Sequence, residues 1–248
     1  MTKQGELDYL RNIGDAGREH AMHKPFSNGD CGLTLMSIGA VMSLMPYRPA
    51  RILDLGCGSG WTSIFFASHG YQVVGQDLAP DMIELAEEAK AYHRVGDHLQ
   101  FLISDYESLA FRDEFDCAVF FDCLHHADDE GAAIAKVYEA LKPGGIMITH
   151  EPGLGHSTTP HSIEAMRIYG VNERDMPPSL IIAQGEKVGF GDARIYPMQH
   201  DLQEVFYQGK QPRLFSKSGW RKLRRLINMT FSPSLDQSAI VVLRKPAA

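Results

Sequence analysis

The stretch Ile52-Leu-Asp-Leu-Gly-Cys-Gly-Ser-Gly60 decides the fold, because it joins an apolar run to a turn that contains three glycines. Residues 51–55 form the apolar run, and residues 61–69 then follow a helical pattern that Gly70 closes. Glycines in such a turn have no Cβ, so a ligand can approach the backbone closely. The first turn of the helix offers free N–H groups and the positive end of its dipole to an anionic group. The stretch therefore predicts a strand, a ligand-binding turn and a helix.

Short apolar runs alternate with helical patterns on both sides of this stretch. We expect strands at residues 51–55, 71–76, 99–103, 115–121 and 146–149. We expect helices at residues 33–44, 61–69, 82–92 and 134–141, the last stopped by Pro143. This alternation predicts βαβ units with right-handed crossovers, and a parallel sheet covered by helices on both faces.

The part of the chain after residue 150 has a different pattern. Helices are expected around residues 162–169 and 179–189, and strands at 193–197 and 238–243. The last two strands are separated by an insertion, within which residues 217–225 contain five basic residues and favour an amphipathic helix. We predict a single domain, divided into a helical cap (1–48), a ligand-binding core (49–150), a pocket region (151–236) and a last strand (237–248).

Composition excludes several classes of protein. The 248 residues are 44% hydrophobic and 22% charged, which rules out a disordered chain, a collagen-like fibre and a coiled coil. The formal net charge of −7 is a poor match for duplex nucleic acid. The four cysteines form no CxxC pair, so we read them as reduced thiols of a cytoplasmic protein. The longest mostly apolar stretch, residues 32–45, is too short to span a bilayer, so no membrane contact is expected.

Three acids lie at or near the ends of predicted strands. Asp54 lies two residues before the first glycine of the turn, and Asp77 closes the second strand. An acid at the position of Asp77 can accept hydrogen bonds from both hydroxyls of a ribose. Asp105 follows the third strand, where a carboxylate could accept a hydrogen bond from an adenine amino group. These positions predict a nucleoside-containing ligand.

Five motifs, LDLGCGSG, VVGQDLAPDMIELA, SDYESLAF, FDCAVFFDCLHHADD and LKPGGIMI, follow in this order between residues 49 and 150. The series resembles that of class I S-adenosylmethionine-dependent methyltransferases. The resemblance implies a Rossmann-like doubly wound α/β sheet of seven strands, in the order 3-2-1-4-5-7-6 with strand 7 antiparallel. It also implies S-adenosylmethionine as cofactor and S-adenosylhomocysteine as product.

The resemblance further implies where the cofactor binds. The glycine turn would hold its methionine part, Asp77 the ribose, Asp105 and the Tyr106 backbone the adenine, and the segment after residue 121 would lie beside the sulfonium. The full predicted set is Asp54, Gly56, Cys57, Gly58, Gly60, Trp61, Asp77, Leu78, Met82, Ser104, Asp105, Tyr106, Asp122 and Cys123.

The sequence leaves two alternatives to an S-adenosylmethionine enzyme. A dinucleotide oxidoreductase such as an NAD-dependent dehydrogenase carries G-x-G-x-x-G, and here Trp61 stands at the sixth place, which argues against it. A non-catalytic cofactor-binding module is the other alternative. A protein that binds S-adenosylhomocysteine but not NAD would support the methyltransferase prediction and contradict the dehydrogenase alternative.

The acceptor of the methyl group requires a separate argument. Methyl transfer from a sulfonium mainly needs a positioned nucleophile and exclusion of water, with one base for an oxygen or nitrogen acceptor. Ligands bind at the carboxyl ends of parallel strands, where His125, His126 and Glu151 lie. We predict His126 as the base, with an ordinary pKa of about 6.5. His125 and Glu151 are the next candidates, and structural hydrogen bonds are the alternative role for each.

Further histidines are expected around the acceptor. Arg18, His20 and His23 lie in a polar N-terminal segment, with the two histidines spaced to share one helical face. These three residues would face the acceptor or the cofactor, or else lie on a solvated helix. His150 and His156 are also expected near the acceptor. No spacing matches a zinc motif, so no metal is predicted.

These observations predict an enzyme that methylates a small molecule, more readily at a hydroxyl than at nitrogen. Methylation of a small-molecule nitrogen, of RNA or of protein is the alternative. The basic residues 217–225 would form a solvated helix face or contact an anionic partner, so nucleic acid is a weak candidate. The sequence leaves the oligomeric state open, with a homodimer as one possibility.

Overall fold

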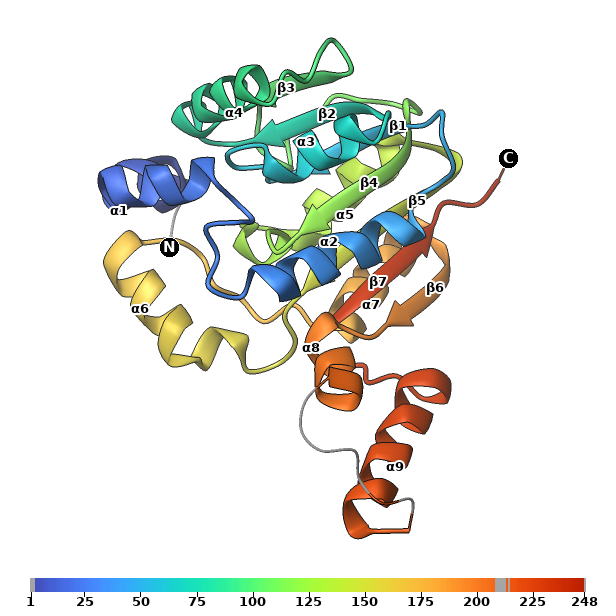
Figure 1. Ribbon diagram of the computed structural model, residues 1–248. Coiled ribbons are helices and arrows are strands. Elements are labelled where there is room, and N and C mark those ends of the chain that lie inside the picture. The colour runs from blue at the N-terminus through green and yellow to red at the C-terminus, as the bar shows by residue number, and fades with distance from the viewer. Residues whose placement is uncertain (1–2, 208–212, 214, 248) are drawn as a thin grey trace.

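The computed structural model describes residues 3–207, 213 and 215–247. A seven-stranded sheet in the order β3-β2-β1-β4-β5-β7-β6 forms its centre (Figure 1). The strands are β1 (Arg51–Leu55), β2 (Gln72–Asp77), β3 (Leu99–Ile103), β4 (Phe115–Phe121), β5 (Leu141–Glu151), β6 (Gly191–Tyr196) and β7 (Ala239–Arg244). Strands β1 to β5 pair in parallel, whereas β7 runs antiparallel to both β5 and β6. The predicted order and the antiparallel last strand are confirmed.

Helices cover both faces of the sheet. The longer helices are α1 (Lys3–Met22), α2 (Cys31–Leu44), α3 (Trp61–Ser68), α4 (Pro80–Tyr92), α5 (Glu130–Ala140), α6 (Pro160–Tyr169), α7 (Pro178–Val188) and α9 (Lys217–Phe231), with the short α8 (Gln199–Leu202). One face packs against α5 and α7, and the other against α2, α3 and part of α4. Ala118 and Phe120 of β4 face the first layer, whereas Cys117 and Val119 face the second. This alternation explains why β4 reads as a continuous apolar run.

Two boundaries differ from the sequence prediction. Helix α5 begins at Glu130, because the Asp129 side chain accepts a hydrogen bond from the Ala132 N–H and caps the N-terminal end, and the helix runs to Ala140. Strand β5 begins at Leu141, which pairs with Phe115 across an irregularity in the register. The strand therefore includes the Pro-Gly segment that we expected to separate it from the helix.

Helix α1 lies over the carboxyl edge of the sheet. Its Leu10 side chain packs with Met82 and Leu85 of α4, and Tyr9 meets Tyr169 of α6 edge to face. Gly14 interrupts the helix with φ 64°, a conformation that favours glycine. These contacts place the N-terminal segment directly above the glycine turn.

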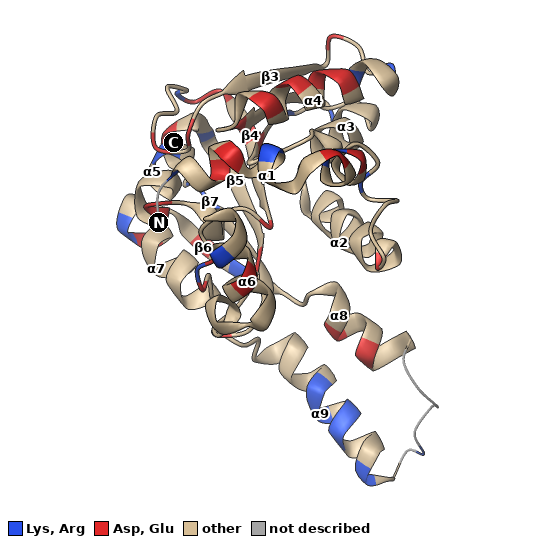
Figure 2. Cartoon of the chain, turned by 90° about the vertical axis from the view of Figure 1, so that its left-hand side faces the viewer, with Lys and Arg blue, Asp and Glu red and all other residues tan. Residues whose placement is uncertain are grey.

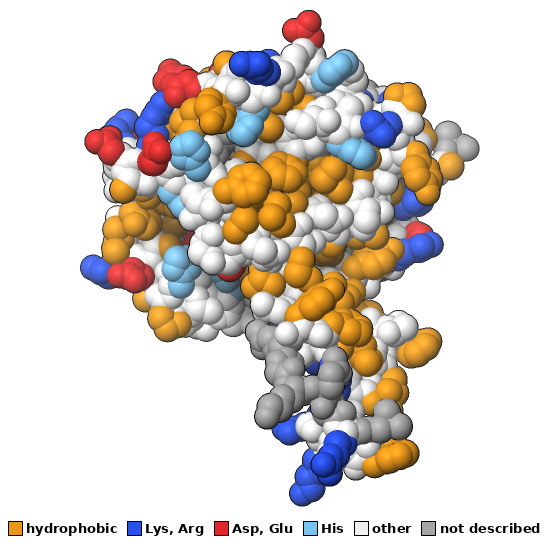
Figure 3. Space-filling view, viewed as in Figure 1, with side chains coloured by type: hydrophobic (Ala, Val, Ile, Leu, Met, Phe, Trp, Pro, Cys, Tyr) orange, Lys and Arg blue, Asp and Glu red, His pale blue; other side chains and the backbone are white. Residues whose placement is uncertain are grey.

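Helix α9 projects away from the sheet, and Lys and Arg colour much of its length (Figures 1 and 2). The predicted amphipathic helix is confirmed. Figure 3 shows hydrophobic side chains on the same projection, where Trp220, Leu223, Ile227 and Phe231 are exposed. In the described part of the chain, no helix combines the length and apolar character needed to cross a bilayer.

Candidate active site

The glycine turn between β1 and α3 is the floor of the site. Gly56, Gly58 and Gly60 have φ values of 59°, 52° and 77°, which disfavour residues with a Cβ. A Cβ at Gly56 would lie 2.4 Å from the Tyr106 hydroxyl oxygen, whereas one at Gly58 would meet nothing within 4 Å. Gly56 therefore permits close packing inside the protein, and Gly58 leaves its side of the turn open to a ligand.

Asp54 is below this turn and does not line the cavity. Its buried Oδ2 accepts hydrogen bonds from the hydroxyls of Thr62 (2.6 Å) and Ser63 (2.5 Å), both in the first turn of α3. Its Oδ1 has no hydrogen-bond partner among the described residues, and burial raises the pKa of the carboxyl to about 6. Asp54 thus ties β1 to α3 and fixes the turn from beneath.

Asp77 ends β2 beside the turn. Its Oδ2 accepts the Gly58 N–H at 2.8 Å, and its Oδ1 accepts the Ala79 N–H at 2.9 Å. Burial raises the pKa of Asp77, although these backbone hydrogen bonds oppose the shift. An ionised carboxylate has about four lone-pair positions. Lone pairs therefore remain for hydroxyl donors in the cavity, which is what a ribose diol would supply.

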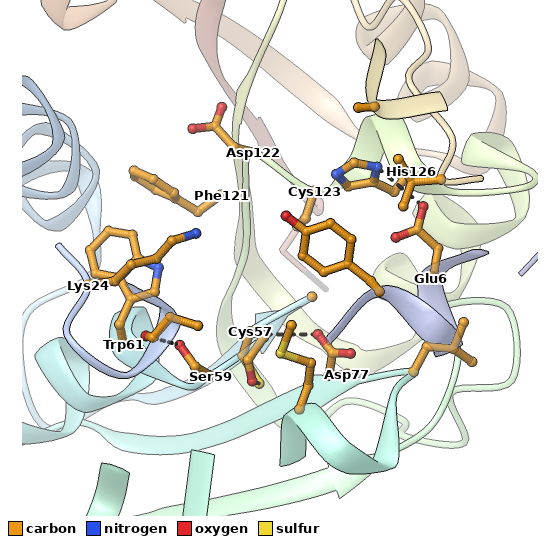
Figure 4. Close-up of a pocket in the computed structure, with 18 of the residues that line it drawn as sticks. Glu6, Lys24, Cys57, Ser59, Trp61, Asp77, Phe121, Asp122, Cys123 and His126 are labelled. Carbon is orange, nitrogen blue, oxygen red and sulfur yellow. Dashed lines mark hydrogen bonds and ion pairs between the residues drawn. The ribbon is translucent and has the colours of Figure 1, made fainter. Parts of the chain in front are cut away.

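A cavity of about 710 Å³ opens above the turn. This volume is within the range of small-molecule sites. Figure 4 shows Cys57 and Ser59 at its floor, Lys24, Trp61 and Phe121 on one side, and Glu6 and His126 on the other. The predicted residues that line it are Gly56, Cys57, Gly58, Trp61, Asp77, Leu78, Met82, Asp105, Tyr106, Asp122, Cys123, His126 and His20.

The other predicted residues are absent from the cavity lining, and Gly60 and Ser104 are among them. At Gly60, a Cβ would come within 2.7 Å of Phe101, so the glycine allows α3 to pack closely against β3. The Ser104 carbonyl oxygen accepts a short hydrogen bond from the Gln76 side chain, and its hydroxyl bonds to the Asp105 carbonyl. Both residues shape the backbone around the cavity.

Helix α1 supplies wall residues that the sequence analysis missed. Lys3 Nζ lies 2.8 Å from Asp105 Oδ2 and 3.0 Å from Glu107 Oε2, so the N-terminus is fastened to the loop after β3. Glu6 and Tyr9 follow on the same helix and also line the cavity. No motif signals these residues, because their contacts join positions about 100 residues apart.

A second group lies at the end of β4. Asp122 has φ 52°, an unusual conformation for a residue other than glycine, and its Oδ1 is 2.9 Å from His150 Nδ1. The His150 ring is buried and stacks on Phe121 with the centroids 4.5 Å apart. Burial opposes a charge on His150, but the Asp122 carboxylate raises its pKa. His150 therefore supports Asp122 from behind and does not line the cavity.

Lys24 lies on the same side of the cavity as Trp61, Phe121 and Asp122 (Figure 4). Burial lowers the pKa of its ammonium group, and the carboxylate of Asp122 opposes this shift. Lys24 follows the end of α1, and sequence spacing alone gave no sign of it.

His126 is the predicted base that reaches the cavity. Its Nδ1 lies 2.5 Å from the Asn172 carbonyl oxygen and 3.4 Å from Glu6 Oε1. Because a carbonyl only accepts, Nδ1 carries the proton, and Nε2 of the neutral ring keeps its lone pair. Burial and the neighbouring His125 lower the pKa of His126 to about 3, which corrects the ordinary value that we assumed. The neutral ring is therefore the form present at neutral pH.

Glu151 and His125 do not line the cavity. The Glu151 carboxylate is fully buried and accepts the N–H groups of Cys123 (3.0 Å) and Leu124 (2.8 Å) on Oε1. Its Oε2 lies 2.7 Å from His125 Nδ1. Burial opposes a charge on His125, but Glu151 raises its pKa. Glu151 therefore orients the loop after β4 and the His125 ring, and cannot reach an acceptor directly.

The remaining predicted residues also lie elsewhere. Arg18 forms an exposed ion pair with Glu88. His23 follows the end of α1 and forms an ion pair with Glu19, so His23 does not share a helical face with His20. His156 Nε2 lies 2.6 Å from Glu173 Oε2. Glu173 lines the cavity and was not predicted.

Comparisons with known proteins agree with this architecture. Residues 52–145 match the methyltransferase domain family. A ubiquinone biosynthesis O-methyltransferase of Cereibacter sphaeroides is 34% identical over 105 residues, covering 42% of each chain. The tRNA 5-carboxymethoxyuridine methyltransferase of Escherichia coli is 31% identical over 109 residues, covering 43% of this chain and 42% of that protein. The match thus spans less than half the length of these relatives.

Solved structures share the fold over the whole chain. Phosphoethanolamine N-methyltransferase 2 of Haemonchus contortus, solved with S-adenosyl-L-methionine, aligns with a TM-score of 0.68 at 20% identity, covering 100% of this chain and 60% of that one. A putative methyltransferase in complex with the Haloferax volcanii Trm112 activator aligns with a TM-score of 0.64 at 17% identity, covering 98% and 97%.

The sheet order, the glycine turn and the acid at the end of β2 define a Rossmann-like methyltransferase fold. Residues 52–145 match the methyltransferase domain family, and they lie within a fold of the class I S-adenosylmethionine-dependent methyltransferase type.

Proposed function

We propose that this protein transfers the methyl group of S-adenosylmethionine to a hydroxyl oxygen of a small molecule. One observation carries the proposal: a single cavity joins the glycine turn and Asp77 to a polar wall that includes His126 and Glu6. Its volume of about 710 Å³ leaves room for a small acceptor beside the cofactor. The named activities of the O-methyltransferase relatives support an oxygen acceptor.

The described residues fit the cofactor. Asp77 would accept the ribose hydroxyls, and the open side of Gly58 would admit the methionine part. Asp105 would accept a hydrogen bond from the adenine amino group. Lys3 forms ion pairs with the carboxylates of Asp105 and Glu107. The cofactor, when bound, supplies an electrophilic methyl group on a sulfonium. Asp122 and Cys123 line the part of the cavity where that end would lie.

His126 is the side chain that we assign to the acceptor oxygen. Its Nδ1–H is fixed by the Asn172 carbonyl, so the unprotonated Nε2 is the nitrogen available to the acceptor. Helix α1 contributes Glu6 and Tyr9 to the cavity lining, and these side chains would help to exclude water from the acceptor. His125 and Glu151 hold the loop that carries His126, so we assign them a positioning role.

The first test addresses cofactor binding. Asp77→Ala is expected to weaken binding of S-adenosylhomocysteine by about 1.5–3 kcal/mol, because charged hydrogen bonds are lost. Isothermal titration calorimetry measures this loss. Asp192→Ala removes an exposed carboxylate on β6, at the other edge of the sheet, and is the matched control. Equal affinities for the two variants would show that Asp77 does not contact the ribose.

The second test addresses the chemistry. Radiolabelled S-adenosylmethionine and a metabolite extract should yield a labelled small molecule, and a label only in RNA or protein would contradict the proposal. With the acceptor identified, His126→Ala should lower kcat by about 100-fold or more while cofactor affinity stays within about threefold. Since the pKa of His126 is lowered to about 3, the rate should show no loss from protonation of His126 near pH 6.5. An unchanged kcat would remove His126 from the reaction.

A further inference from the structure

Side chains from four separate segments meet at the acceptor wall of the cavity and directly behind it. Glu6 comes from α1, His125 and His126 from the turn after β4, Glu151 from β5, and Glu173 from the segment before α7. Ligand atoms of His125, His126 and Glu173 all lie within 4.8 Å of one another. His126 and Glu173 also line the cavity, so the cluster is accessible from the acceptor side.

The two histidines are oriented in the same manner. His125 Nδ1 faces the Glu151 carboxylate at 2.7 Å, and His126 Nδ1 faces the Asn172 carbonyl oxygen at 2.5 Å. Both partners are oxygen acceptors, which places a proton on each Nδ1 and leaves Nε2 to point elsewhere. Histidines that bind metals nearly always donate their other ring N–H to a carboxylate or a carbonyl in this way.

The charge of the cluster lacks a permanent counterion. The side chains of Glu151 and Glu173 are 0% and 9% exposed. Within the described ranges, every ion-pair partner of Glu6, Glu151 and Glu173 is a histidine, and no Lys or Arg pairs with them. A buried carboxylate is costly unless it is paired or coordinates a metal. A cation among these groups would therefore be strongly stabilised.

We propose that His125 Nε2, His126 Nε2 and the Glu173 carboxylate bind a divalent first-row transition-metal ion of the Zn²⁺ type. Nitrogen and carboxylate ligands suit such ions better than Mg²⁺ or Ca²⁺, which prefer oxygen. Ligand atoms sit about 2.0–2.2 Å from zinc, so around a tetrahedral ion they lie about 3.3–3.6 Å apart, and the three side chains must move closer together by up to about 1.5 Å to bind it. His156, bonded to Glu173, and Glu151, bonded to His125, would orient the ligands.

Three protein ligands leave at least one coordination position open. Because His126 and Glu173 line the cavity, we infer that this position faces the acceptor and selects one with an oxygen donor. With the ion bound, His126 Nε2 is a ligand and cannot also take the proton, so the acceptor hydroxyl would bind the ion through its oxygen and give its proton to the Glu6 carboxylate, which also lines the cavity. The methyl group would then join that oxygen as its bond to sulfur breaks, leaving neutral S-adenosylhomocysteine. This part rests on the proposed function, whereas binding of the ion does not.

The experiment measures Zn²⁺ binding to the full chain after treatment with a chelator, by titration calorimetry and elemental analysis. We expect one ion per chain in the wild type. Glu173→Gln and His125→Gln should each weaken binding by tenfold or more. His161→Gln, which changes a cavity histidine outside the cluster, should bind within about threefold of the wild type. Substitution with Co²⁺ should give visible absorption bands that both cluster variants lose.

The outcomes separate this inference from the proposed function. Absence of Zn²⁺ binding, or equal binding by the wild type and both cluster variants, would overturn the metal site. In the second case, other histidines of the chain would hold the ion. Glu173→Gln keeps the shape of a partly buried side chain, so it remains informative if His125→Gln fails to fold. Binding of S-adenosylhomocysteine, measured on the same samples, tests the methyltransferase proposal independently.

Discussion

The two ends of the cavity are built in opposite ways. The cofactor end consists of a glycine turn and strand ends whose residues are close in sequence, with backbone N–H groups holding Asp77. The acceptor end is lined by side chains of α1, the turn after β4 and the segment around Glu173, and side chains of β5 are buried behind them. The first end depends on local backbone conformation, whereas the second depends on side-chain contacts between distant segments. Substitutions should therefore act through binding at the first end and through stability at the second.

The largest effect is expected at Glu151. Glu151→Ala would leave the N–H groups of Cys123 and Leu124 without their acceptor and remove the partner of His125. Loss of one partner from a buried, hydrogen-bonded charge costs about 3–5 kcal/mol. Urea denaturation should show this loss in the free energy of unfolding. Glu151→Gln retains one acceptor oxygen and should lose less, and if both variants were as stable as the wild type, the acceptor end would not depend on this carboxylate.

The cofactor end should respond differently. Gly58→Val places a branched side chain at φ 52°, in the open space above the turn. We expect binding of S-adenosylhomocysteine to fall by about 100-fold or more (≳2.7 kcal/mol), while the strain costs only about 1–2 kcal/mol of stability. Gly144→Val is the matched control, because Gly144 has φ 79° and open space but does not line the cavity. Equal affinity in the two variants would mean that the turn does not contact the ligand.

A smaller effect, dependent on pH, is expected at Glu6. Burial raises its pKa from 4.5 to about 7, so the folded protein binds more protons than the unfolded chain between these values. Stability from this group is complete below about pH 4.5 and is lost as the pH rises through 7. Glu6→Gln should therefore match the wild type near pH 4.5 and exceed it by about 1–3 kcal/mol at pH 8. Thermal melts of the wild type and the variant across this pH range measure the difference, and the exposed Glu19→Gln is the control. A stability difference between Glu6→Gln and the wild type that stays constant with pH would contradict the raised pKa of Glu6.

The contrast also explains what the sequence could predict. The strand order, the glycine turn and the acid at Asp77 follow from local motifs, and the structure reproduces the expected sheet. Near the acceptor, spacing along the chain pointed to His125, Glu151 and His150, which are buried behind the wall. Glu6, Lys24 and Glu173 line the cavity without any motif, because only tertiary packing brings them there. The pKa of His126 likewise depends on burial that composition does not reveal.

Helix α1 has a kinetic consequence. It lines one side of the cavity and is fastened through Lys3 to the loop that holds Asp105. A bound cofactor would contact this helix, so we expect exchange of spent for fresh cofactor to be coupled to the opening of α1. Turnover would then be paced by a motion of the N-terminus, and amide hydrogen exchange in α1 should slow when S-adenosylhomocysteine is bound.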